Sequence, residues 1–185
     1  MNHYPLEDRL LLKPLDPEVQ QRIERLRALG IGSQPDQEFD EFAAKLAHIT
    51  GAPFAMVNFI NDREQFFAGL YTPSSAKTGA AMEAAHDSVG REMGLDEGFC
   101  PHVVARRKAL VLDDVCDYPR FAGNPVVDKL GIRSYLGAPI IDRTGTALGT
   151  ICVVATEPRP WGRPGLDMIK TLAAELTEKI HQREQ

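Results

Sequence analysis

The chain has little cysteine, with only three among its 185 residues. A small and odd number of cysteines argues against a disulfide framework, which in secreted domains uses an even number of them. We therefore expect free thiols and a reducing compartment. At this length the chain can bury a hydrophobic core without disulfide or metal cross-links.

The sequence also lacks long hydrophobic runs and a surplus of basic residues. No stretch approaches the roughly 20 apolar residues that a membrane span requires, and residues 1–13 lack the basic start and apolar segment of a signal peptide. Lys and Arg number 21 against 26 Asp and Glu, which gives a net charge of −5, whereas nucleic-acid binders usually need a basic face. We expect a cytoplasmic protein that binds neither membranes nor nucleic acids.

Motifs of common enzyme classes are missing as well. The sequence has no glycine-rich phosphate loop, no recognisable Ser-His-Asp set and no His-Glu-x-x-His run. We therefore expect no enzymatic activity. Internal repeats are also absent, so the chain is interpreted as an N-terminal arm (1–16) and a single domain (17–182) that includes both terminal helices.

Two segments in the first third of the chain predict amphipathic helices. The first follows Pro17, with Asp16 as its N-cap and Gly30 as its end. The second covers residues 36–50 and ends at Gly51. Its apolar side is formed by Phe39, Phe42, Ala43, Leu46 and Ile49.

A third helix is predicted over residues 165–182, with apolar residues spaced three and four apart. The stripe comprises Leu166, Ile169, Ala173, Leu176 and Ile180. It can pack on the domain's own sheet, or it can pair with the first helix and a second subunit. The second alternative leads us to expect a homodimer through the terminal helices.

Apolar runs between these helices predict five strands, at residues 54–60, 65–71, 109–115, 135–141 and 147–154. The first is apolar on both faces and should be central in its sheet. Turns at 61–64 and 142–145 make two hairpins. Short helices are predicted at 80–89, 99–107 and 124–130, and residues 72–97 have the composition of a lid or binding loop. Antiparallel strands with helices at both ends indicate an α+β fold.

The order of several short motifs resembles the GAF domain family, over roughly residues 20–182. The motifs are Ala55–Ile60, Gln65–Phe67, Phe99-Cys100-Pro101-His102, Val111–Asp114, Pro119–Phe121, Tyr135–Pro139 and Leu148–Cys152. The resemblance implies a central antiparallel sheet of five or six strands, related to PAS and profilin-like architectures. It places the terminal helices on one face, and on the other it places loops and short helices that enclose a ligand pocket.

Eight residues are candidates for ligand contact: Phe99, Cys100, His102, Asp113, Asp114, Phe121, Arg133 and Tyr135. Arg133 offers a planar fork for carboxylate or phosphate, and Tyr135 a flat apolar face with a polar tip. Asp113 and Asp114 should point to opposite faces of their strand. One of the two either caps the next turn or orients Arg120 or His102.

Cys100 and His102 leave several alternatives open, among them a reactive thiol, a metal site and simple packing. A Cys-x-His pair supplies only two ligands where zinc usually takes four, so no metal site is expected. The signatures of GAF domains that bind cyclic nucleotides, attach bilins or reduce methionine-R-sulfoxide are not matched. The sequence identifies no cofactor.

The resemblance implies a non-enzymatic sensory or regulatory domain. We expect it to bind an unidentified small molecule and to signal through a dimer interface or a signalling protein partner. Two alternatives remain: an interaction module whose pocket is vestigial, and a thiol-based redox sensor or an enzyme similar to methionine sulfoxide reductase.

Overall fold

A six-stranded antiparallel sheet in the order β3-β2-β1-β6-β5-β4 forms the centre of the molecule. The computed structural model describes residues 13–73 and 90–184. The strands are β1 (Phe54–Ile60), β2 (Glu64–Tyr71), β3 (Glu92–Gly94), β4 (Leu110–Leu112), β5 (Ser134–Ile141) and β6 (Ala147–Ala155). The α+β fold and both hairpins are confirmed.

Strands β1 and β6 lie at the centre, and every residue of both is buried. Helices cover both faces of this pair, which explains why their sequences are nearly continuous apolar runs. The register places Met56 opposite Cys152 and Asn58 opposite Thr150. Residues of these two pairs share one face of the sheet, since side chains on a strand alternate between faces.

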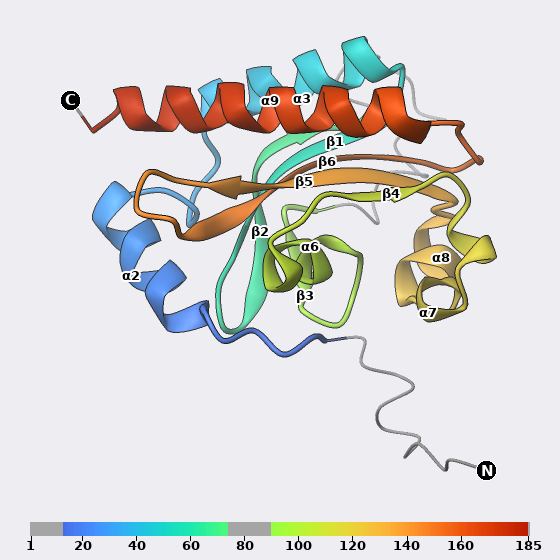
Figure 1. Cartoon of the computed structure of the whole chain (residues 1–185), viewed down its shortest axis with the longest axis horizontal. Helices are drawn as coiled ribbons and strands as arrows, with labels where there is room; N and C mark the ends of the chain where they lie inside the picture. The colour runs from blue at the N-terminus through green and yellow to red at the C-terminus, as the bar shows by residue number, and fades with distance from the viewer. Residues whose placement is uncertain (1–12, 74–89, 185) are drawn as a thin grey trace.

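Helix α3 (Gln37–Thr50) lies beside the C-terminal helix on one face of the sheet (Figure 1). Its N-cap is Asp36, whose carboxylate accepts a hydrogen bond from the Phe39 amide at 3.3 Å. It ends at Gly51, which has a left-handed φ of 70°. The prediction that Ile49 belongs to its apolar side is wrong, because Ile49 lies at the edge of the apolar arc and is 49% exposed.

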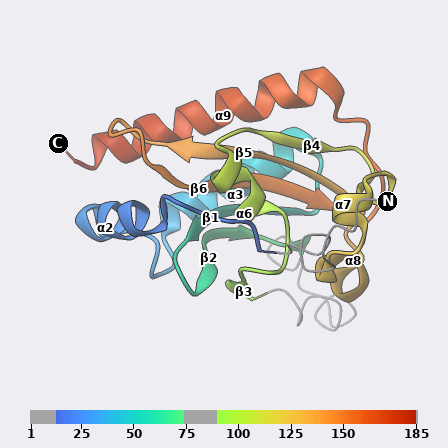
Figure 2. The same cartoon turned by 60° about the horizontal axis from the view of Figure 1, so that its bottom comes forward.

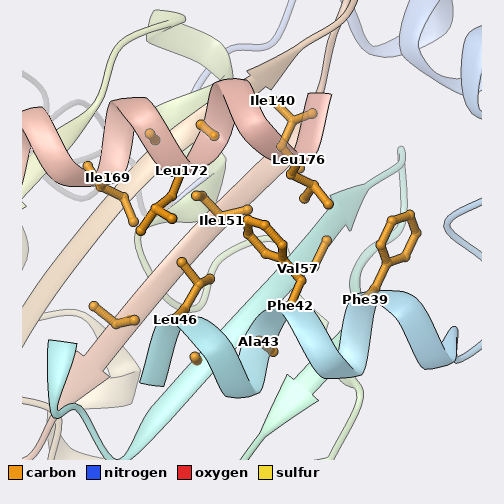
Figure 3. Packing of buried hydrophobic residues seen from close by; sticks show 14 of the residues in the cluster. Phe39, Phe42, Ala43, Leu46, Val57, Ile140, Ile151, Ile169, Leu172 and Leu176 are labelled. Carbon is orange, nitrogen blue, oxygen red and sulfur yellow. The ribbon is translucent and has the colours of Figure 1, made fainter. Parts of the chain in front are cut away.

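The C-terminal helix α9 (Gly162–Gln182) packs on the chain's own sheet, and its side chains meet those of α3 over β1, β5 and β6 (Figure 3). Leu176 and Ile180 are buried in this core. Of the two interpretations of the apolar stripe, the structure supports packing within the chain, and the stripe's core residues are not available to a second subunit. Trp161, also buried, precedes the helix and belongs to the same core.

Helix α2 (Val19–Leu29) lies at one end of the sheet (Figure 1) and ends at the predicted Gly30. Its N-cap is Glu18 and not the predicted Asp16. Asp16 instead binds the fully buried Arg22, with 2.6 Å between Oδ2 and Nη1. This ion pair supplies the partner that a buried guanidinium requires.

The opposite face of the sheet is covered by short elements, which Figure 2 brings into view. These are α6 (Cys100–Arg106), a 3-10 turn (Val115–Asp117), α7 (Pro119–Ala122) and α8 (Pro125–Leu130). The predicted strand 109–115 is shorter than expected, since β4 ends at Leu112 and the chain turns into the 3-10 segment. Strand β3 and helix α7 were not predicted.

The predicted helix at 80–89 and most of the predicted lid at 72–97 lie outside the described residues. Within residues 13–73 and 90–184, none of the helices combines the length and apolar character needed to cross a bilayer.

Candidate ligand pocket

A small apolar cavity of about 40 Å³ lies between the sheet and the short helices α6 and α8. Its wall is built from strands β1, β2, β3, β5 and β6 and from the segments that cover them. The lining residues are Phe54, Met56, Gln65, Phe67, Met93, Gly98, Phe99, Cys100, Val126, Leu130, Ile132, Tyr135, Cys152 and Val154. Almost all of the exposed lining is therefore carbon and sulfur.

Sulfur atoms gather on one wall of this cavity. The Sγ atom of Cys100, on α6, is 3.6 Å from the Sγ atom of Cys152 on β6 and 3.1 Å from the Tyr135 hydroxyl on β5. The Cys152 Sγ atom is 3.8 Å from the Sδ atom of Met56 on β1. Gly137 leaves the space that Tyr135 occupies, because a Cβ atom there would lie 2.3 Å from the hydroxyl oxygen.

The two thiols differ in acidity. Burial opposes ionisation of Cys100, but the adjacent side chains of Cys152 and Tyr135 stabilise its charged form and lower the pKa of Cys100 to about 7. The hydrogen bond to Cys100, together with burial, raises the pKa of Cys152 well above its ordinary value. Cys100 is therefore the thiol that ionises first.

The Tyr135 hydroxyl stays protonated beside these thiols. Burial, with the adjacent Cys100, raises the pKa of Tyr135 well above its ordinary value. A neutral phenol can donate a hydrogen bond to a thiolate. Tyr135 can therefore stabilise a negative charge on Cys100 and does not itself ionise in place of the thiol.

Gln65 connects the sheet to the loop at the pocket's edge. Its Nε2 atom donates to the carbonyl oxygens of Gly94 and Glu97 at 2.7 and 2.6 Å, and its Oε1 atom accepts from Asn58 Nδ2 at 2.8 Å. The Oδ1 atom of the fully buried Asn58 has no hydrogen-bond partner among the described residues. Most buried polar atoms in proteins are paired, so this oxygen is an exception.

Three of the predicted site residues, Phe99, Cys100 and Tyr135, line the cavity. His102 and Phe121 lie directly behind them in an aromatic cluster. Ring centroids are 5.3 Å apart for Phe99 and Tyr135, 5.6 Å for Phe99 and Phe121, and 5.3 Å for His102 and Phe121. His102 and Phe121 therefore support the wall of the cavity without lining it.

The structure does not place Arg133 and Asp114 in the cavity lining. They bind each other, with Arg133 Nε and Nη2 at 3.2 and 2.9 Å from the two carboxylate oxygens. The hydrogen bond from Arg133 lowers the pKa of Asp114, which also caps the 3-10 turn by accepting from the Cys116 amide. This pair holds a loop in position. The Arg133 guanidinium is already bound by the Asp114 carboxylate.

Asp113 likewise serves the backbone. Its Oδ1 atom accepts a hydrogen bond from the Gly162 amide at 3.3 Å, at the start of α9. The structure does not support the prediction that Asp113 or Asp114 orients Arg120: Asp114 binds Arg133, and the Arg120 guanidinium lies 5.6 Å from the Phe121 ring centroid. The alternative in which one aspartate caps the next turn is confirmed at Asp114.

The sequence matches the GAF domain family model over residues 34–180, which is most of the chain. The chain belongs to the GAF domain family. It is 26% identical, over 161 residues, to a cyclic di-GMP phosphodiesterase of Pseudomonas aeruginosa. That alignment covers 86% of this chain and 24% of the relative, so the chain spans about a quarter of the relative's length.

Solved structures share the GAF fold at low sequence identity. The GAF domain of an Acinetobacter phosphoenolpyruvate-protein phosphotransferase superposes with a TM-score of 0.59 at 16% identity, over 92% of this chain and 97% of that one. Free methionine-R-sulfoxide reductase from Neisseria meningitidis gives a TM-score of 0.60 at 15% identity, over 94% and 96% of the two chains. These likenesses show the fold alone.

Sequence reasoning missed three buried polar side chains on the face of the sheet that carries this GAF domain's pocket. Asn58, Gln65 and Thr150 are each at most 1% exposed and were not singled out. The available signal was a polar residue inside an otherwise apolar strand, as in Phe54–Ile60. The contact between Cys152 and Cys100 was not foreseen either.

Proposed function

We propose that this GAF domain is a non-enzymatic sensory domain that binds a small, mostly apolar molecule in the cavity beneath α6 and α8. The observation that carries the proposal is an apolar cavity bordered by buried polar groups, among them Tyr135 and Gln65. Ligand sites are typically apolar surfaces with a few polar groups that fix orientation.

The size of the cavity requires movement on binding. At about 40 Å³ it is far smaller than the ~150 Å³ that holds benzene in an engineered protein cavity. A ligand would therefore favour an arrangement in which α6, α8 and the Gly94–Gly98 loop lie farther from the sheet. That preference shifts the population between two arrangements and so converts binding into a signal.

The signal would leave through a partner protein or a second copy, which contacts the outer faces of α3 and α9. Substitution of Leu176 or Ile180 would disrupt the core and therefore cannot serve as a test of this interface. Ala174 is exposed on α9 and borders a surface groove, and Ala28 is an exposed alanine on α2. Light scattering of Ala174→Glu should show loss of dimers, whereas Ala28→Glu should leave them intact.

The ligand proposal is tested by thermal shift against a metabolite library, followed by native mass spectrometry of the hits. Leu130→Phe should fill the cavity and abolish the shift, since Leu130 lines it. Ile49→Phe adds the same ring to an exposed site on α3 and should leave the shift unchanged. A hit that stabilises Leu130→Phe as much as the wild type would contradict binding in this cavity.

A thiol-based redox sensor is the second candidate, favoured by the 3.6 Å separation of Cys100 and Cys152. The Cys100 thiolate would attack one oxygen of hydrogen peroxide, form a sulfenic acid and release hydroxide. The Cys152 sulfur would then attack the sulfenic sulfur of Cys100, which forms the disulfide and displaces hydroxide. The proton of the Cys152 thiol converts this hydroxide to water.

This step closes the sulfur–sulfur distance to about 2.05 Å, through rotation of the two side chains or approach of α6 to β6. In a Cys116→Ser background, mass spectrometry after peroxide should show the loss of two hydrogen atoms. Removing Cys152 as well should leave a sulfenic acid that a dimedone probe traps. Unchanged mass in the folded protein would exclude the redox sensor.

A further inference from the structure

Three sulfur atoms from three different elements meet at the wall of the cavity. They belong to Met56 on β1, Cys100 on α6 and Cys152 on β6, which are 6%, 4% and 2% exposed. Among the described residues, the cavity lining contains no carboxylate, imidazole, ammonium or guanidinium group. Two thiols and one thioether form a soft set of ligands, which selects monovalent copper over harder cations.

We propose that Met56, Cys100 and Cys152 bind one monovalent copper ion. Two of the three sulfur–sulfur separations are close to those of a trigonal site. With metal–sulfur distances of about 2.3 Å, three ligands in a plane lie ~4 Å apart. The Cys100–Cys152 and Cys152–Met56 sulfur distances are 3.6 and 3.8 Å, so a small outward movement accommodates the ion.

The sheet fixes two of the three ligands in advance. Met56 and Cys152 are directly opposite each other in the β1–β6 register, at the centre of the sheet. Cys100 comes from α6, which packs over this pair, so its movement can adjust the third distance. A site on a rigid strand pair with one adjustable ligand needs little reorganisation to bind.

The proton and charge balance of the site is simple. A thiol that coordinates a metal is deprotonated, so copper binding releases the protons that the two thiols still hold, and the complex carries one negative charge. The Tyr135 hydroxyl, 3.1 Å from the Cys100 sulfur, is placed to donate a hydrogen bond to that ligand. Tyr135 is thus a positioning residue that stabilises the buried negative charge.

Zinc fits this site poorly. Structural zinc sites use four ligands drawn from Cys, His, Asp and Glu. Within the described part of the chain, no group of three or more such residues is arranged to hold a metal. The thioether of Met56 can supply the third ligand, and thioethers suit copper(I).

The test is an anaerobic titration of the reduced full-length chain with copper(I) in competition with a colorimetric copper(I) chelator. The wild type should withhold one equivalent from the chelator. Cys100→Ala and Cys152→Ala should each weaken binding by at least a hundredfold, and Met56→Leu by about tenfold. Cys116→Ser removes the exposed thiol outside the cavity and should bind like the wild type.

X-ray absorption of the copper-loaded wild type should show three sulfur ligands, and this measurement does not depend on any variant folding. The melting temperatures of the apo variants identify those that lose binding through unfolding. Retention of copper by folded Cys100→Ala and Cys152→Ala, nitrogen or oxygen ligands in the spectrum, or no copper withheld by the wild type would each overturn the site.

The copper site does not rest on the proposed organic ligand. Its titration uses copper(I) alone and the library screen uses metal-free protein with a chelator present. Failure of one experiment therefore leaves the result of the other intact.

Discussion

The two faces of the central sheet are built differently, although they share the same strands. The face under α3 and α9 buries a continuous set of apolar side chains that includes Phe39, Leu46 and Leu176. The face under α6 and α8 buries apolar side chains together with thiols, a phenol and amides, and it contains a cavity. The first face is a closely packed core, whereas close packing on the second face is interrupted by the cavity.

Alternation along a strand makes this division possible. Met56 and Val57 are neighbours on β1, yet Met56 lines the cavity and Val57 packs under the helices. Cys152 and Val153 divide in the same way on β6. One strand pair therefore carries both roles, since consecutive side chains point to opposite faces.

The largest expected difference between the faces lies in the cost of losing apolar volume. Leu46→Ala should lower the free energy of unfolding by about 3–4 kcal/mol, because Leu46 is fully buried and well packed. Leu130→Ala should cost about 1 kcal/mol, because Leu130 is only partly buried and already borders a cavity. Chemical denaturation measures both, and equal costs would contradict the division of roles.

A smaller effect is expected from crowding the pocket face. In Gly137→Ala the new methyl group would displace the Tyr135 hydroxyl, which costs about 2 kcal/mol and disturbs the contact with Cys100. Because this contact is disturbed, Cys100 in a Cys116→Ser background should be alkylated at a different rate with Gly137→Ala than without it. Gly123→Ala is the matched control, because φ there is −90° and a Cβ atom would meet nothing within 4 Å.

The smallest effect concerns an ion pair at the end of the sheet. Burial raises the pKa of Asp142, but hydrogen bonds from Thr144 and Arg25 outweigh it and leave that pKa below its ordinary value. A carboxyl with a lowered folded pKa stabilises the protein above its unfolded pKa, and this contribution is lost as pH falls.

The stability advantage of the wild type over Asp142→Asn should therefore be present near neutral pH and shrink as pH falls below about 4. Urea denaturation across this range provides the measurement. Asp128→Asn, an exposed site on α8, removes the same charge and should follow the wild-type profile. An advantage of the wild type that persists at low pH would show that hydrogen-bond geometry and not charge matters at Asp142.

Local signals in the sequence were sufficient for much of the helical face. The Asp36 cap, the Gly51 stop and the apolar spacing between them define α3 within one residue. The two hairpins follow from turn residues and apolar runs, and both depend on neighbours in the chain.

The pocket face depends on contacts between distant residues and was therefore harder to predict. Cys100 and Cys152 are 52 positions apart, and no local pattern indicates that their sulfur atoms meet. Arg133 has the chemistry to bind an anionic ligand, but tertiary packing supplies Asp114 as its partner. The short edge strand β3 is specified by pairing with β2 and has little apolar character of its own.

The strand order affects how the domain folds during its synthesis. Met56 and Cys152 are adjacent across the centre of the sheet but 96 positions apart in sequence. Contacts between such distant positions raise contact order and slow folding. During synthesis the β1–β2 hairpin has to wait, with the edge of β1 unpaired, until β6 has left the ribosome. The pocket is therefore among the last features of the nascent domain to form, and until then the unpaired edge of β1 is open to pairing with other chains.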